Sequence, residues 1–122
     1  MGVFRFWIPL QVRSKEFGMN ELYSQSKHWA TRKRQAQQVH MLVKSQIRKV
    51  DRNARPFDKP VVVTIWYNTR LDIDNHGYLA KLIIDGMKGI LIQDDDRKHV
   101  KGIRQYFHSN DKCKVLVEVE EV

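Results

Sequence analysis

The sequence predicts an α/β (α+β) sandwich, in which two main helices pack on a mixed β-sheet of about four strands in the order β-α-β-α-β-β. Three observations predict this class. Apolar residues alternate in several short segments, they recur at three- and four-residue steps in two others, and the two kinds of segment follow one another along the chain. A chain of 122 residues is long enough for one domain with a modest core. We therefore expect a single domain over residues 1–122.

The first half of the chain predicts one strand and one long helix. Residues 3–9 (VFRFWIP) alternate apolar and other side chains, which predicts a strand that stops near Pro9. Residues 29–50 carry apolar side chains on one stripe of helical spacing, which predicts an amphipathic helix. Two prolines and an asparagine in residues 51–60 end this helix and begin a connection.

The second half predicts a buried strand, a short helix and two further strands. Residues 61–67 (VVVTIWY) form a nearly continuous hydrophobic run, typical of a central strand that is buried on both faces. Residues 78–89 have helical spacing, and Gly89 is suited to end that helix. Residues 99–107 and 114–121 predict the last two strands. In the final strand we expect one buried face and one face that becomes solvated toward its end.

The charge of the chain is positive and unevenly distributed. Lys and Arg number 22 against 14 Asp and Glu, and residues 1–70 hold fourteen of the basic residues but only four acidic ones. A clustered basic surface usually has a polyanionic partner, because each neutralised phosphate releases counterions. The alternative is that the excess charge aids solubility and that half of the helix cations are merely solvated. The candidate DNA-binding residues are Arg32, Lys33, Arg34, Lys44 and Arg48.

Function classes that need a membrane span or paired cysteines are disfavoured. No apolar run approaches the roughly 20 residues of a spanning helix, and the N-terminal residues lack the features of a signal peptide. The single cysteine, Cys113, permits neither an intrachain disulfide nor a CxxC site. We expect a cytoplasmic protein with no membrane partner and no small-molecule cofactor.

Six aspartates lie between positions 72 and 96. Asp72 and Asp74 follow the hydrophobic run at spacing two, so in an extended segment their side chains share a face about 6.5 to 7 Å apart. The triplet Asp94–Asp96 forms a second acidic turn. Because the helix between them returns the chain, both acidic turns can meet at one edge of the sheet.

Clustered aspartates in a basic chain predict a metal site. Like charges at close range repel one another unless a cation intervenes, and aspartate oxygens are ligands that Mg²⁺ prefers. A Mg²⁺ ion held in this way can activate a water and stabilise the charge that develops on a phosphodiester, which is nuclease chemistry. The alternative is that these aspartates are turn formers and solvated loop residues. The alternative function is a non-catalytic, basic nucleic-acid-binding protein such as a small phage regulator.

Three segments resemble the RusA-type Holliday-junction resolvases, a family found largely in phages and prophages. They are DIDN at 72–75, KLIIDGMKG at 81–89 and GILIQDD at 89–95. The resemblance implies a symmetric homodimer and a Mg²⁺-dependent endonuclease, for which Mn²⁺ can substitute. Such an enzyme resolves four-way junctions or other branched DNA by paired phosphodiester hydrolysis, in DNA recombination and repair.

The same resemblance assigns roles to individual residues. It implies Asp72 and Asp74 as catalytic metal ligands, with Asp94 or Asp95 as the third, and the triplet leaves Asp96 open as well. The family lysine falls on Lys81, which could stabilise the attacking water or the leaving oxygen. Here the gap from Asp74 to Lys81 is about one helical turn longer than in the family, and the alternative is a solvent-facing helix residue.

Overall fold

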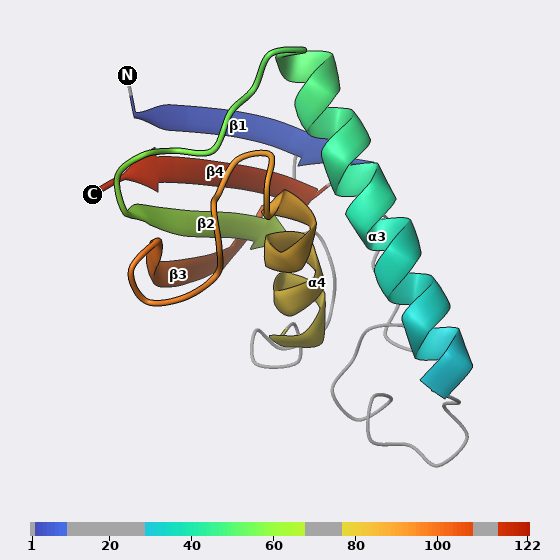
Figure 1. The fold of residues 1–122 in the computed structure, drawn as a ribbon. Helices are drawn as coiled ribbons and strands as arrows, with labels where there is room; N and C mark the ends of the chain where they lie inside the picture. The colour runs from blue at the N-terminus through green and yellow to red at the C-terminus, as the bar shows by residue number, and fades with distance from the viewer. Residues whose placement is uncertain (1, 10–28, 68–76, 109–114) are drawn as a thin grey trace.

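The computed structural model describes residues 2–9, 29–67, 77–108 and 115–122. Within these ranges the chain forms a four-stranded sheet and two helices (Figure 1). The elements are β1 (Val3–Ile8), α3 (Trp29–Val50), β2 (Val61–Tyr67), α4 (Gly77–Met87), β3 (Val100–Phe107) and β4 (Val115–Glu121). The α+β class and the order β-α-β-α-β-β are confirmed, and each element begins and ends within two residues of the predicted bounds.

The sheet is mixed, and its strands lie in the order β1-β4-β2-β3. Strand β4 pairs antiparallel with both β1 and β2, whereas β3 pairs parallel with β2. Strand β2 is therefore central, and five of its seven residues are buried, as its continuous apolar run predicts. Strands β1 and β3 form the two edges.

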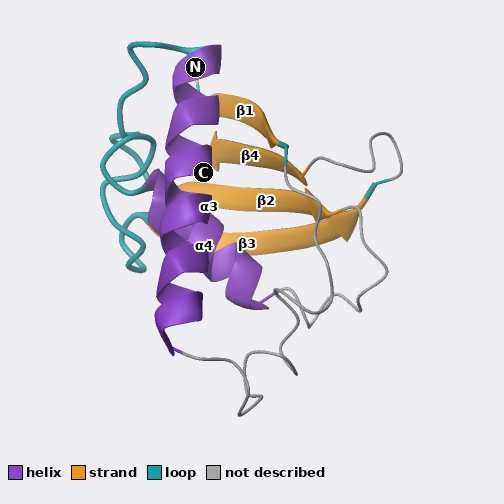
Figure 2. Ribbon diagram, turned by 90° about the vertical axis from the view of Figure 1, so that its right-hand side faces the viewer, coloured by secondary structure: helices purple, strands orange, loops and turns teal. Residues whose placement is uncertain are grey.

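Both helices lie on the same side of the sheet (Figure 2). The predicted stripe of α3 faces the core, where Val39, Val43 and Ile47 are at most 2% exposed. The core-facing strand positions alternate, as in β2, where Val61, Val63, Ile65 and Tyr67 are buried. Among the residues described, no helix is both long enough and apolar enough to cross a membrane.

Strand β4 differs from its predicted pattern at one residue. Val115, Val117 and Val119 are buried as expected. Glu118 is also buried, at 9% exposed, whereas the sequence pattern predicts a face that becomes solvated. Arg5 of the neighbouring strand β1 forms an ion pair with Glu118. A carboxylate can lie at this central position because a cation on the adjacent strand compensates its charge.

Gly86 allows α4 to approach α3 closely. A Cβ atom at this position would lie 3.1 Å from Cβ of Val43 and 3.2 Å from Cα of His40. The ammonium group of Lys44 donates a hydrogen bond of 2.8 Å to the carbonyl oxygen of Gly86. The two helices are therefore joined by packing around a residue without a side chain and by one hydrogen bond across the contact.

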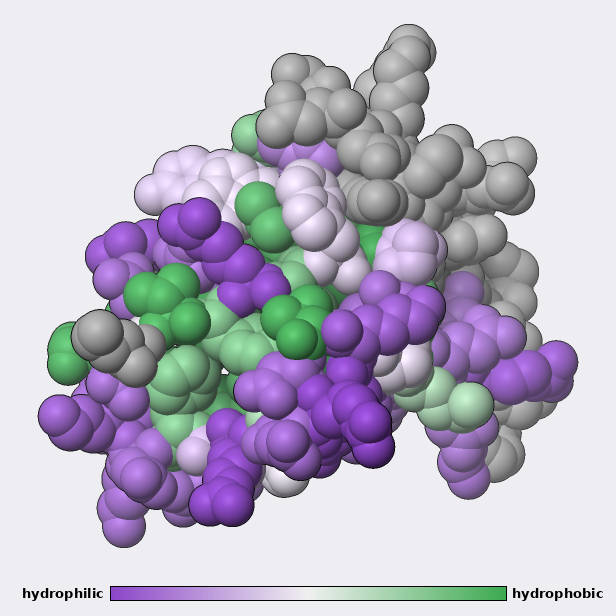
Figure 3. Space-filling model, turned by 90° about the horizontal axis from the view of Figure 1, so that it is seen from above, coloured by the Kyte–Doolittle hydropathy of each residue, from purple (hydrophilic) through white to green (hydrophobic). Residues whose placement is uncertain are grey.

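Hydrophobic side chains also reach the surface at the ends of several elements. Seen from above, one face shows a hydrophobic area between hydrophilic ones (Figure 3). Val3, Val50 and Val122 are each more than half exposed. Val50 is the last residue of α3, so the apolar stripe of this helix is buried at Val39, Val43 and Ile47 but exposed at its end.

We expect the Gly89→Ala variant to be less stable than the parent protein. Gly89 has a φ of +80°, a conformation in which a Cβ costs about 1–2 kcal/mol. A Cβ built at Gly89 or at Gly102 would meet nothing within 4 Å, and of these two glycines only Gly89 has a positive φ. Urea unfolding should show a loss of about 1 kcal/mol for Gly89→Ala and no loss for the matched control Gly102→Ala. Equal losses in both variants would contradict this assignment.

Candidate functional site

The aspartate triplet lies where β3 begins. Asp96 Oδ1 is 2.6 Å from Nδ1 of His99, which directly precedes β3, and it also accepts a hydrogen bond from the amide of His99 at 3.2 Å. The hydrogen bond from the His99 side chain lowers the pKa of Asp96. Of the three candidates for a third ligand, Asp96 is thus the one whose carboxylate is held by a neighbouring histidine.

Lys88 places its ammonium group among three carboxylates. Its Nζ atom lies 3.2 Å from Oδ2 of Asp95, 3.4 Å from Oδ1 of Asp85 and 3.9 Å from Oδ1 of Asp94. The hydrogen bond to Asp95 is the largest of the effects that raise the pKa of Lys88. Lys88 therefore compensates part of the repulsion that the sequence predicts for this cluster.

The turn after α4 brings these groups together. Gly89 reverses the chain with its positive φ, and its amide donates a hydrogen bond of 2.7 Å to the carbonyl oxygen of Ile92. Ile90, Leu91 and Ile92 are buried and anchor this segment in the core. The two exposed residues Asp94 and Asp95 follow at a distance that Lys88 can reach.

Asp85 pairs with a lysine of its own helix. Its side chain is 17% exposed, and Oδ2 lies 2.8 Å from Nζ of Lys81, one turn earlier. The Lys81 side chain is 68% exposed. The ion pairs found in the described residues thus join Lys88, and not Lys81, to Asp94 and Asp95. Sequence reasoning missed Lys88. Two features of the sequence pointed to Lys88: it lies three residues after Asp85, and Gly89 follows it.

Asp72 and Asp74 lie outside the described residues. Strand β2 ends at Tyr67, which pairs with Phe107 at the opposite end of β3 from the triplet. The next described residue is Gly77, and the nine intervening residues could span about 30 Å if extended. The expected meeting of the two acidic turns therefore stays a prediction.

The described residues supply only some of the ligands that a hard cation needs. Its ranges contain no group of three or more His, Cys, Asp and Glu side chains that could hold a metal ion. Asp94 and Asp95 nevertheless offer accessible carboxylate oxygens, with side chains 53% and 39% exposed. Such oxygens suit Mg²⁺, which retains several waters and needs few protein ligands. Asp94 and Asp95 can therefore supply part of a ligand set.

Helix α3 presents the predicted basic residues in two different ways. Lys33 and Arg34 are exposed, and Arg32 is half-buried. Lys44 and Arg48 are exposed too, but they also donate hydrogen bonds to backbone carbonyl oxygens. Lys44 donates to Gly86, and Arg48 donates to Arg52 and Ala54. A carbonyl accepts a hydrogen bond without cancelling the positive charge. Lys33, Arg34, Lys44 and Arg48 therefore contribute to a positive helix surface.

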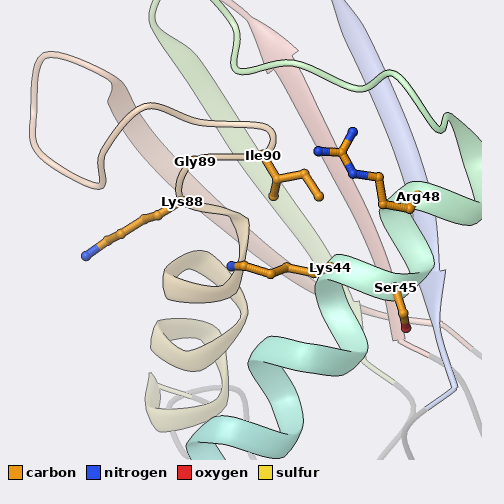
Figure 4. Close-up of a pocket in the computed structure, with 6 residues that line it drawn as sticks. All are labelled: Lys44, Ser45, Arg48, Lys88, Gly89 and Ile90. Atoms are coloured by element: carbon orange, nitrogen blue, oxygen red, sulfur yellow. The ribbon is translucent and has the colours of Figure 1, made fainter.

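A pocket of about 420 Å³ lies between this basic surface and the segment that follows α4. It is lined by Lys44, Ser45 and Arg48 of α3 and by the segment 88–90. In Figure 4 the Lys44 side chain extends toward α4, whereas Lys88 points away from α3. Lys88 thus borders the pocket with its stem and reaches the carboxylates with its ammonium group.

The sequence matches no protein-family model and no curated protein.

His40 provides a titratable group at the contact between the helices. Its Nε2 atom is buried and has no hydrogen-bond partner in the described structure. Burial lowers the pKa of His40, Asp85 opposes this effect, and Lys44 is the first of three lysines that add to it. The fold therefore favours the neutral form of His40.

We expect His40 to make the protein less stable in mild acid. The pKa of His40 is lower in the folded protein than the value of 6.5 in the unfolded chain, so the neutral side chain contributes to the free energy of unfolding above pH 6.5. This contribution is lost as the pH falls toward the folded pKa. The melting temperature should fall between about pH 7.5 and about pH 5, and it should fall less in the His40→Gln variant, which cannot be protonated in this range. Thermal unfolding at both pH values measures the difference. An equal fall in both proteins would show that His40 does not contribute.

Proposed function

We propose that the protein is a Mg²⁺-dependent endonuclease of the RusA type, which resolves four-way junctions or similar branched DNA. The observation that carries this proposal is the position of Lys88, which contacts Asp94 and Asp95 and borders the pocket formed with Lys44 and Arg48. Carboxylates suited to a hard cation thus lie beside a helix surface suited to phosphates. A phosphodiesterase needs both features side by side.

The aspartates would form the ligand set. In this proposal Asp72 and Asp74 of the DIDN motif bind Mg²⁺ or Mn²⁺ together with Asp94 or Asp95. The bound ion would supply an activated water and stabilise the charge on the phosphodiester. The chain's own contribution is to hold the carboxylates at the surface, and Lys88 keeps Asp94 and Asp95 close together by attracting both.

The basic residues of α3 would bind the DNA backbone. Contacts to phosphates position a duplex without reading its sequence. Lys33, Arg34, Lys44 and Arg48 are exposed along one helix, and Lys44 and Arg48 border the pocket. A symmetric homodimer would present two such sites for paired cuts.

The second candidate function is non-catalytic nucleic-acid binding. The observation in its favour is that the carboxylates already have cationic partners: Lys88 for Asp94 and Asp95, and Lys81 for Asp85. A protein of this kind would use the same surface of α3. The two candidates differ in whether a divalent ion produces nicks.

We expect junction binding to depend on the exposed cations of α3 and on salt. In EDTA the logarithm of the affinity for a synthetic four-way junction should fall linearly with the logarithm of the salt concentration. Replacing both Lys33 and Arg34 by Ala should reduce the slope by about 1 for each lost phosphate contact. The matched control is Lys59→Ala with Arg55→Ala, which removes the same charge from the exposed loop before β2. The same slope in both double variants would contradict the assigned surface.

We expect nicking to need the aspartates individually. Asp72→Asn and Asp74→Asn should each abolish Mg²⁺-dependent nicking of a four-way junction, because an amide is a weak ligand for this ion. One of the variants Asp94→Asn and Asp95→Asn should also abolish nicking, and that variant identifies the third ligand. Asp96→Asn should retain activity, because its carboxylate is held by His99.

The matched control for these variants is Asp58→Asn, an exposed aspartate in the loop before β2. Junction binding in EDTA should persist in all the aspartate variants, since the changes remove negative charge near phosphates. If the parent protein binds junctions but never nicks them with Mg²⁺ or Mn²⁺, the nuclease proposal is wrong and the binding function replaces it.

A further inference from the structure

The sheet face opposite the helices carries a row of large side chains. The register pairs Trp7 with Leu116, Leu116 with Trp66, and Trp66 with Tyr106, so one row crosses all four strands. The core uses the alternate positions of β1, β2 and β4, so the row faces away from α3 and α4, and Tyr106 of β3 joins it as the partner of Trp66. In the described part of the chain no helix packs on this face, since both helices lie on the other (Figure 2).

Two of these side chains form an aromatic platform at the edge of the sheet. The rings of Trp66 and Tyr106 are stacked, with centroids 5.9 Å apart and an interplanar angle of 26°. Tyr106 lies on the edge strand β3 and is 50% exposed. A hydrophobic ring of this size, half open to solvent, is a typical contact for another flat ring.

Positive charge accompanies the platform. Arg104 is exposed and lies two residues before Tyr106 on the same strand, so the two side chains share a face about 6.5 to 7 Å apart. Between positions 97 and 108 the chain has four Lys or Arg residues and no acidic residue. Among the described residues, Glu118 and Glu120 of β4 point to this face. Arg5 forms an ion pair with Glu118, and Glu120 lies at the other end of the strand from the aromatic row.

We propose that this face binds single-stranded DNA, with an unpaired base against the Trp66–Tyr106 platform and a backbone phosphate on Arg104. Aromatic rings that stack on bases beside cations that hold phosphates are the usual means of binding single strands. Charge complementarity favours this polyanion over a second copy of the chain, which would bring the basic strand β3 against another basic strand. The choice of DNA rests on the proposed function, whereas the platform itself does not.

The test separates the base from the backbone. The full chain is titrated in EDTA, by fluorescence anisotropy, with labelled oligothymidylate of about 15 nucleotides and with an abasic strand of the same length and charge. Tyr106→Ala should weaken binding of oligothymidylate about tenfold and leave binding of the abasic strand unchanged. Tyr106→Phe keeps the ring and should bind both strands like the parent protein. The matched control is Met41→Ala, which removes an exposed apolar side chain from α3, where Met41 is 72% exposed, and should change neither affinity.

Several results would overturn the proposal. The proposal is wrong if the parent protein and Tyr106→Ala bind oligothymidylate with equal affinity. It is also wrong if Tyr106→Ala loses affinity equally for oligothymidylate and for the abasic strand. Dissociation of an oligomer in Tyr106→Ala, seen by sedimentation, would show that a second copy covers the face. Tighter binding of oligouridylate would overturn the choice of DNA. If Tyr106→Ala does not fold, Tyr106→Leu replaces it, because leucine keeps the apolar bulk without the ring. The titration needs neither a metal ion nor nicking, so it still tests the platform if the nuclease proposal is wrong.

Discussion

The close contact between α3 and α4 at Gly86 is the constraint on which the candidate site depends. Because a side chain is absent there, Val43 and the backbone of His40 can pack directly against α4. This approach brings Lys44 within reach of the Gly86 carbonyl and places the end of α4 beside the basic surface of α3. If the helices were held apart by one more layer of atoms, the pocket between α3 and residues 88–90 would widen. The packing of α3 against α4 thus determines how close the cations of α3 lie to the end of α4.

The electrostatic balance of the acidic cluster follows from the same geometry. Three carboxylates lie within 4 Å of Lys88, and Asp85 also pairs with Lys81, so two ammonium groups face three carboxylates and the cluster keeps a net negative charge. Lysine is a point charge that can withdraw on its flexible stem, so a divalent ion could replace it without any change in the backbone. In a nuclease, Lys88 would therefore support the folded site before the ion binds and compete with the ion for the same oxygens.

The sequence predicts the elements better than it predicts the contacts between them. Periodicity sufficed for α3 and β2, because burial of one stripe or of one continuous run is a local pattern. The burial of Glu118 could not be predicted, since its partner Arg5 lies 113 residues away in the sequence. Lys88 was missed for a similar reason: its partners Asp94 and Asp95 come within reach only through the turn at Gly89. For Asp72 and Asp74 the motif is still the basis of the assignment.

The pairing of several acidic residues leaves the formal charge of +8 unchanged, because each ion pair removes one positive and one negative charge from the field that a polyanion meets. Asp85 and Asp95 have lysine partners, Asp96 is bonded to His99, and Arg5 compensates Glu118. Lys44 and Arg48 of α3 donate hydrogen bonds to backbone carbonyls, which leave their charge intact. Asp85, Asp95, Asp96 and Glu118 thus have basic partners, whereas Lys33 and Arg34 of α3 and Arg104 of β3 are exposed. Because these elements lie on different sides of the molecule, a branched polyanion could contact both, with its duplex phosphates on the helix and its unpaired bases on the sheet.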